Sequence, residues 1–124
     1  MTGMKKLFIS ISHAWRGITW LMKDEVNARI ELAIAILVIG LGIWLKLSGV
    51  EWCFVLICIG GVLSAEAFNT SVENLCDFHT KEMDERIRVI KDVAAGSVLI
   101  TGIMAILIGV VIFGPKIFQL FGGG

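Results

Sequence analysis

Charged residues and proline are scarce in this 124-residue chain, and their scarcity limits the kind of protein it can be. Asp, Glu, Lys and Arg together make up 18% of the residues, there is a single proline, and no long polar tract occurs. Hydrophobic residues account for 56% of the chain, and its mean hydropathy is +0.86. This composition indicates an integral membrane protein. The 11 basic and 11 acidic residues cancel, which gives no reason to expect a nucleic-acid partner.

Familiar metal and nucleotide motifs are also missing. The three cysteines, Cys53, Cys58 and Cys76, form no CxxC pair and no Cys/His pair at zinc spacing. The chain contains neither GxxxxGK[ST] nor a kinase-type glycine loop. Any nucleotide would therefore have to be held by a metal ion, basic residues and helix ends.

Three apolar segments are present, and they predict transmembrane helices at about 30–47, 52–78 and 90–113. The first two are joined by a short link containing Gly49, which predicts an antiparallel hairpin. The link before the third span, residues 79–90, is long and charged. Pro115 follows the third apolar run and is expected to stop that helix.

The segment before the first span alternates apolar and basic residues at helical spacing. It predicts an amphipathic helix at about 4–24, lying on the membrane surface. The alternative, a cleaved signal peptide, needs an unbroken apolar core, which His13 and Arg16 interrupt. The predicted fold class is therefore an all-α membrane protein with an N-terminal surface helix and three spans, in a single domain over 1–124.

Basic residues are distributed unevenly around the predicted spans. Nine of them flank the N-terminal side of the first span and the second link, whereas only Lys46 and Lys116 lie on the other side. The positive-inside rule therefore places the N-terminus and the second link in the cytoplasm. At 13.6 kDa the chain buries only a small core of its own, which favours an oligomer.

The second span ends in a polar stripe, "EAFNTSVENLCD", which begins at Glu66. At about 100° per residue, Glu66, Asn69, Glu73 and Asp77 fall within about 80° of one helix face. An ionised side chain inside a membrane costs at least a few kcal/mol, so these groups must face protein, water or a cation. The structural alternatives are hydrogen bonding to neighbouring helices or, for Glu73 and Asp77, contact with headgroup water.

Two more acids, Glu25 and Asp92, are expected at the same depth on neighbouring helices. Acids that face one another from separate helices can hold Mg²⁺, which prefers carboxylate, phosphate and water oxygens. Lys91, next to Asp92, is a point charge suited to phosphate. This combination suggests phosphoryl transfer at a membrane surface.

The sequence "EAFNTSVE", residues 66–73, resembles the E-x-x-N-[ST]-[SA]-[IV]-E signature of the small prokaryotic diacylglycerol kinase family, which includes undecaprenol kinases. The blocks "AWRGITWLMKDEVNARIE" and "IKDVAAGSVL" resemble two further blocks of that family, in the same order and spacing. The resemblance extends from about Phe8 to Phe118.

The resemblance implies a homotrimer of three-span subunits that uses Mg-ATP to phosphorylate a lipid hydroxyl in the bacterial inner membrane. Glycines recurring on the third span, Gly96, Gly102 and Gly109, would permit close helix approach in such an assembly. The implied site residues are Glu66 as general base in contact with substrate, Asn69 supporting the base and the substrate, Glu25 and Glu73 as ligands of Mg²⁺ and thus of Mg-ATP, and Lys91 and Asp92 as nucleotide contacts. The "KEMDE" link corresponds to a segment that closes over ATP. His13 stands where other members have tyrosine, and is the further candidate for a nucleotide contact.

The substrate stays open between diacylglycerol and undecaprenol, since both present a primary hydroxyl on a lipid. The C-terminal apolar sequence is more similar to the undecaprenol kinases. The alternative class is a non-enzymatic oligomer that translocates a proton or an ion through Glu66. That alternative leaves Glu25, Lys91 and Asp92 without a shared role.

Overall fold

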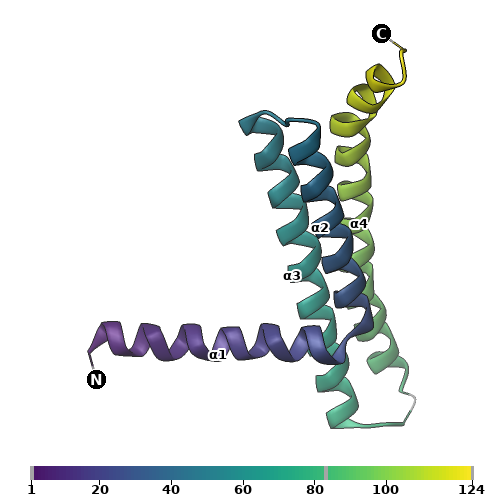
Figure 1. Cartoon of the computed structure of the whole chain (residues 1–124). Coiled ribbons are helices and arrows are strands. Elements are labelled where there is room, and N and C mark those ends of the chain that lie inside the picture. Colours follow the sequence, from purple (N-terminus) through teal and green to yellow (C-terminus); the bar gives the residue numbers. More distant parts are fainter. Residues whose placement is uncertain (1, 83, 124) are drawn as a thin grey trace.

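The computed structural model describes residues 2–82 and 84–123. The described chain forms four helices: α1 (Gly3–Asp24), α2 (Val26–Trp44), α3 (Gly49–His79) and α4 (Glu85–Leu120). Figure 1 shows α2, α3 and α4 as a bundle, with α1 lying across its axis. These three bundle helices are each long and apolar enough to cross a membrane. The protein is therefore an all-helical, multi-pass membrane protein, as its composition predicts.

The turn between α2 and α3 begins earlier than the sequence suggests. Lys46 adopts a left-handed backbone with φ of 59°. The amide of Leu47 donates to the carbonyl of Gly42 at 3.1 Å, and that of Lys46 donates to Ile43 at 3.2 Å. These two bonds form the helix-ending arrangement that usually contains glycine. With a lysine in the position usually taken by glycine, α2 ends at Trp44, three residues before the predicted end of the span at residue 47.

The start of α3 is fixed by a reciprocal cap. The Ser48 hydroxyl accepts a hydrogen bond from the amide of Glu51, whose carboxylate in turn accepts one from the amide of Ser48. Such a cap satisfies two amides that the first helical turn leaves without partners. The turn therefore returns the chain directly, and Figure 1 shows α2 and α3 running antiparallel.

Helix α4 is longer at both ends than its predicted span. It starts at Glu85, where Asp84 caps the amide of Arg86 at 2.8 Å, so the link from α3 shortens to residues 80–84. The predicted stop at Pro115 is wrong, because α4 continues to Leu120. A proline removes one backbone donor and strains its helix, but helices in membranes accommodate it when the freed carbonyl finds another partner.

The apolar core of the single chain lies at the hairpin end of the bundle. Leu47, Val55, Ile112 and Phe113 are buried there. The Lys116 ammonium on α4 lies 3.2 Å from the Glu51 carboxylate on α3 and ties these two helices together. The outward faces of α2, α3 and α4 stay apolar and exposed, as expected for surfaces in contact with lipid or with other copies.

Gly42 marks the closest approach within the hairpin, and replacing it is expected to destabilise the fold. A Cβ at this position would lie 2.8 Å from the Trp52 ring and 2.9 Å from the Leu47 side chain. Gly42→Leu should therefore cost about 1–3 kcal/mol through overpacking, measured by thermal unfolding in detergent. Gly40→Leu is the matched control, since nothing lies within 4 Å of a Cβ there. Equal losses in the two variants would contradict this close approach.

Candidate active site

The polar stripe of α3 contains the most deeply buried polar side chains described. Glu66 and Thr70 are each 2% exposed, and Asn69 is 7% exposed. Leu21 and Ala28, from the region where α1 passes into α2, are also buried at this end of the bundle, as is Cys76 on α3. Contact between α1 and α3 accompanies this junction, which Figure 1 shows at the level of the lower part of α3. Part of the stripe is therefore covered by protein from the preceding helices.

Hydrogen bonds within α3 hold two of the three acids of the stripe, Glu66 and Glu73. The Thr70 hydroxyl donates to Glu66 Oε1 at 3.5 Å, and the Asn69 amide donates to Glu73 Oε1 at 3.4 Å. The side-chain oxygen of Asn69, Oδ1, is buried without a hydrogen-bond partner among the described residues. Thr70 was missed by the sequence analysis, although its position four residues after Glu66 was the available signal.

Two further carboxylates, those of Glu25 and Glu73, act electrostatically on Glu66. Glu25 is the residue between α1 and α2, and its backbone is extended, with φ of −109° and ψ of 116°. Its charge and that of Glu73 both act on the Glu66 carboxylate. With Glu66, these are three of the five acids that the sequence singled out, and both lie within electrostatic range of Glu66. Like charges in a buried place repel one another, so a proton or a cation is needed to stabilise them together.

The carboxylates around Glu66 could hold Mg²⁺ only together with oxygen ligands from a substrate. Within residues 2–82 and 84–123, no group of three or more acidic, histidine or cysteine side chains is arranged to hold a metal by itself. Mg²⁺ keeps several waters, however, and in phosphoryl-transfer sites it is bound by one or two carboxylates together with the substrate's phosphates. Glu25 and Glu73, whose charges both act on Glu66, fit that smaller requirement.

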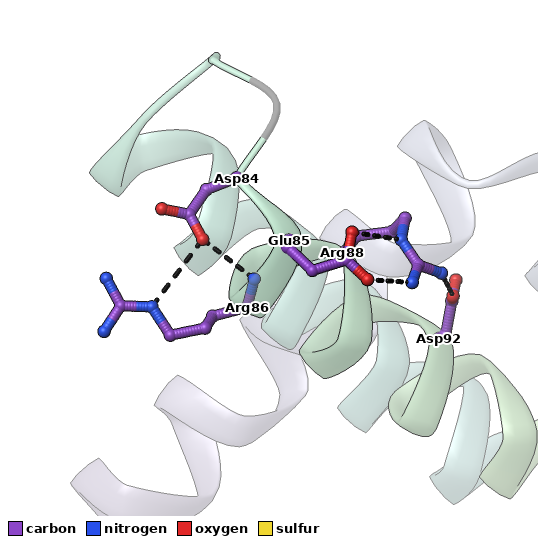
Figure 2. A network of polar contacts seen from close by, with 5 residues as sticks. All are labelled: Asp84, Glu85, Arg86, Arg88 and Asp92. Atoms are coloured by element: carbon purple, nitrogen blue, oxygen red, sulfur yellow. Dashed lines mark hydrogen bonds and ion pairs between the residues drawn. The ribbon is translucent and has the colours of Figure 1, made fainter.

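The predicted nucleotide contacts at the start of α4 are both engaged in ion pairs. The Lys91 ammonium donates to Asp77 Oδ1 at 2.6 Å, which joins α4 to α3. Arg88 donates to Asp92 Oδ2 at 2.8 Å and also bonds Glu85, as Figure 2 shows. Asp77 is therefore more than a residue reaching headgroup water, since it is the counterion of Lys91.

His13 is not brought to this cluster by any contact that the structure records. It is exposed on α1, and among the described residues it makes no hydrogen bond or ion pair. A role for His13 in nucleotide binding thus remains a prediction.

An apolar groove of about 600 Å³ runs between α2, α3 and α4. Residues such as Val38, Ile59 and Ile106 line it, and Glu31 is the one charged side chain among the described residues of its wall. Glu31 Oε2 is buried without a hydrogen-bond partner within the described part of the chain. Glu31 was not singled out from the sequence as a site residue. The available signal was an acid surrounded by apolar residues at the start of a span.

The fold and the site define a class: a small multi-pass helical membrane protein with a buried carboxylate, two further acids that act on it, and an apolar groove between its helices. The profile of the family described as prokaryotic diacylglycerol kinase matches residues 12–113. The chain is 34% identical to the undecaprenol kinase of Bacillus subtilis over 114 residues, covering 92% of this chain and 93% of that protein. It is 27% identical over 115 residues to the diacylglycerol kinase of Synechocystis sp., covering 92% of this chain and 66% of that protein.

The chain belongs to the prokaryotic diacylglycerol kinase family and is a membrane lipid kinase. The resemblance carried by residues 66–73 and the two flanking blocks is thereby confirmed.

Proposed function

We propose that this protein transfers the γ-phosphate of Mg-ATP to the primary hydroxyl of a membrane lipid alcohol at the cytoplasmic interface. The observation that carries the proposal is Glu66, which is 2% exposed and has two further carboxylates acting on it. Burying a carboxylate in this setting is costly, which favours a functional role for it. The groove beside α3 supports a lipid substrate, because its apolar wall suits a hydrocarbon chain.

Glu66 acts as the general base in this proposal. It accepts the proton of the lipid hydroxyl while the hydroxyl oxygen attacks the γ-phosphorus of ATP. The Thr70 hydroxyl occupies Oε1 of Glu66 and so leaves Oε2 for the substrate. The side-chain amide of Asn69 donates a hydrogen bond to the Glu73 carboxylate at 3.4 Å. This bond orients the Asn69 side chain toward the substrate. Most of the rate enhancement then comes from holding the lipid hydroxyl and the γ-phosphate of ATP next to each other in the reactive orientation.

The phosphates of ATP are held by residues on either side of this base. Glu25 and Glu73 would bind Mg²⁺. The bound ion would neutralise part of the negative charge of the phosphates. Lys91 and Asp92 contact the nucleotide from α4. The "KEMDE" segment, residues 81–85, of which residue 83 lies outside the described part of the chain, closes over the nucleotide. His13 on α1 is a further candidate contact. The amphipathic α1 lies on the cytoplasmic surface of the inner membrane, so the lipid and the nucleotide meet at that surface.

Glu31 is proposed to hold the hydroxyl end of the lipid at the mouth of the groove. Its unpartnered carboxyl group, in the protonated form, can donate a hydrogen bond to the hydroxyl oxygen, so the single hydroxyl proton still passes to Glu66. No other charged side chain described lines the groove. Glu31→Leu should raise the KM for the lipid alcohol about tenfold and leave the KM for ATP within about twofold. A steady-state assay that varies each substrate in turn measures both. A matching rise in the KM for ATP would contradict this assignment.

The functional unit is proposed to be a homotrimer. The apolar outer faces of the bundle helices are exposed in the single chain, and Gly96, Gly102 and Gly109 leave space on α4 for a neighbouring helix. Chemical cross-linking in mild detergent should therefore give monomer, dimer and trimer bands, ending at trimer. A ladder that ends at dimer would contradict this assembly.

The decisive experiment compares two lipids in mixed micelles with Mg-ATP and purified protein. We expect phosphorylation of undecaprenol to exceed that of diacylglycerol, in line with 34% identity across nearly the full length of an undecaprenol kinase. A strong preference for diacylglycerol would overturn that choice of substrate. Absence of nucleotide turnover with either lipid would favour the alternative, an oligomer that translocates protons or ions through Glu66.

A further inference from the structure

Asp77 is the anionic partner of Lys91 where α3 and α4 approach the short link. The distance from Lys91 Nζ to Asp77 Oδ1 is 2.6 Å, and the two residues stand on different helices. Arg88, by contrast, takes its partners Glu85 and Asp92 from its own helix (Figure 2). Lys91 is thus held by an acid from the helix that also carries Glu66 and Glu73.

This ion pair contributes little to holding the helices together. The side chains of Lys91 and Asp77 are 35% and 54% exposed, so water competes for both groups. The same helices are joined at the opposite end of the bundle by the Lys116–Glu51 pair and by the apolar core. Exchange of Asp77 for another anion would therefore cost the fold little.

Lys91 also borders the acid cluster. The charges of both Asp77 and Glu73 act on its ammonium. Glu73 in turn acts on Glu66, so the Lys91 ammonium, held on the α3 side by Asp77, is within electrostatic range of an acid that the proposed function assigns to Mg-ATP. The triphosphate of ATP carries more negative charge than the single carboxylate of Asp77, and its oxygens accept charge-assisted hydrogen bonds from an ammonium. Two anions on one ammonium repel each other, so Asp77 and the nucleotide compete for Lys91.

We propose that Asp77 is a positioning residue that occupies Lys91 in the nucleotide-free protein and gives way to a phosphate group when Mg-ATP binds. The proposal rests on the proposed function, because it takes Lys91 as a nucleotide contact. Asp77 keeps the Lys91 ammonium on the α3 side while the site is empty, and its return to Lys91 after transfer promotes release of ADP. The residue therefore lowers nucleotide affinity and speeds product release.

The test is Mg-ATP and Mg-ADP binding to Asp77→Asn in detergent, measured by calorimetry at low and high salt. We expect both nucleotides to bind about threefold to tenfold more tightly at low salt, because one competing charge is lost. The gain should shrink at high salt, where exposed charges are screened. In the lipid kinase assay, the KM for ATP should fall while kcat does not rise. A residue that only held α3 to α4 would not produce this combination.

Two variants separate competition from structure. Asp77→Glu keeps the charge and should bind nucleotide like the wild type. Glu51→Gln removes the acid of the other α3–α4 ion pair and should leave nucleotide affinity unchanged. Asp77→Ser serves as a second neutral variant should Asp77→Asn fail to fold.

Unchanged or weaker nucleotide binding in the neutral Asp77 variants would overturn the proposal, as would tighter binding in Asp77→Glu or Glu51→Gln. Wild-type protein that binds no Mg-ATP at all would instead refute the proposed function. Wild-type protein that binds and uses ATP, combined with a negative result for Asp77, would refute this inference alone. The two failures are therefore distinguishable.

Discussion

Glu66→Gln is expected to lower lipid phosphorylation by about 10²-fold or more while Mg-ATP affinity stays close to that of the wild type. The amide keeps the shape of the carboxylate and can still accept the Thr70 hydrogen bond, but it cannot take the proton of the lipid hydroxyl. The measurements are the initial rate in mixed micelles and nucleotide binding by calorimetry, in the same detergent.

The stability of this variant provides an internal control. Glu25 and Glu73 both act on Glu66 through their charges, so a neutral side chain removes like-charge repulsion from a buried place. The thermal midpoint of Glu66→Gln should therefore equal or exceed that of the wild type, which would show that the lost activity is not lost folding. Near-normal turnover would rule out Glu66 as the base. Loss of nucleotide affinity would indicate instead that the stripe is one metal-binding cluster.

Glu73→Gln should fail in a different way, by losing Mg-ATP affinity and turnover together. The introduced amide would retain an oxygen that can accept from Asn69, but it would lack the hard anionic ligand that Mg²⁺ prefers. We expect the Kd for Mg-ATP to rise about tenfold or more. The Mg²⁺ concentration needed for half-maximal activity should rise as well, measured by titrating Mg²⁺ at fixed ATP.

Added Mg²⁺ distinguishes the two acids. High Mg²⁺ should restore part of the activity of Glu73→Gln and none of the activity lost in Glu66→Gln. Glu51→Gln, which alters an acid of the same helix at the opposite end of the bundle, should respond to Mg²⁺ as the wild type does. An unchanged Mg²⁺ requirement in Glu73→Gln would remove Glu73 from the proposed metal site.

Family membership was predictable because it is carried by a contiguous pattern. Residues 66–73 combine acids and an amide at helical spacing within an apolar segment, so the chemistry is visible without knowledge of packing. The profile match over residues 12–113 confirms that prediction. Helix ends were less predictable, since Lys46 takes a backbone conformation that usually requires glycine and Pro115 lies inside α4.

The sequence by itself determined that this is a three-span membrane protein of a lipid kinase family, because hydropathy and motif spacing are local properties of the chain. Only the tertiary structure decided which side chains meet. It paired Asp77 with Lys91, fourteen residues later in the sequence, and it placed Glu25 where its charge acts on Glu66. It also placed Glu31 in the wall of the groove. Such contacts depend on how helices rotate and cross, and a helical pattern fixes the face on which a residue lies but not the helix that this face meets.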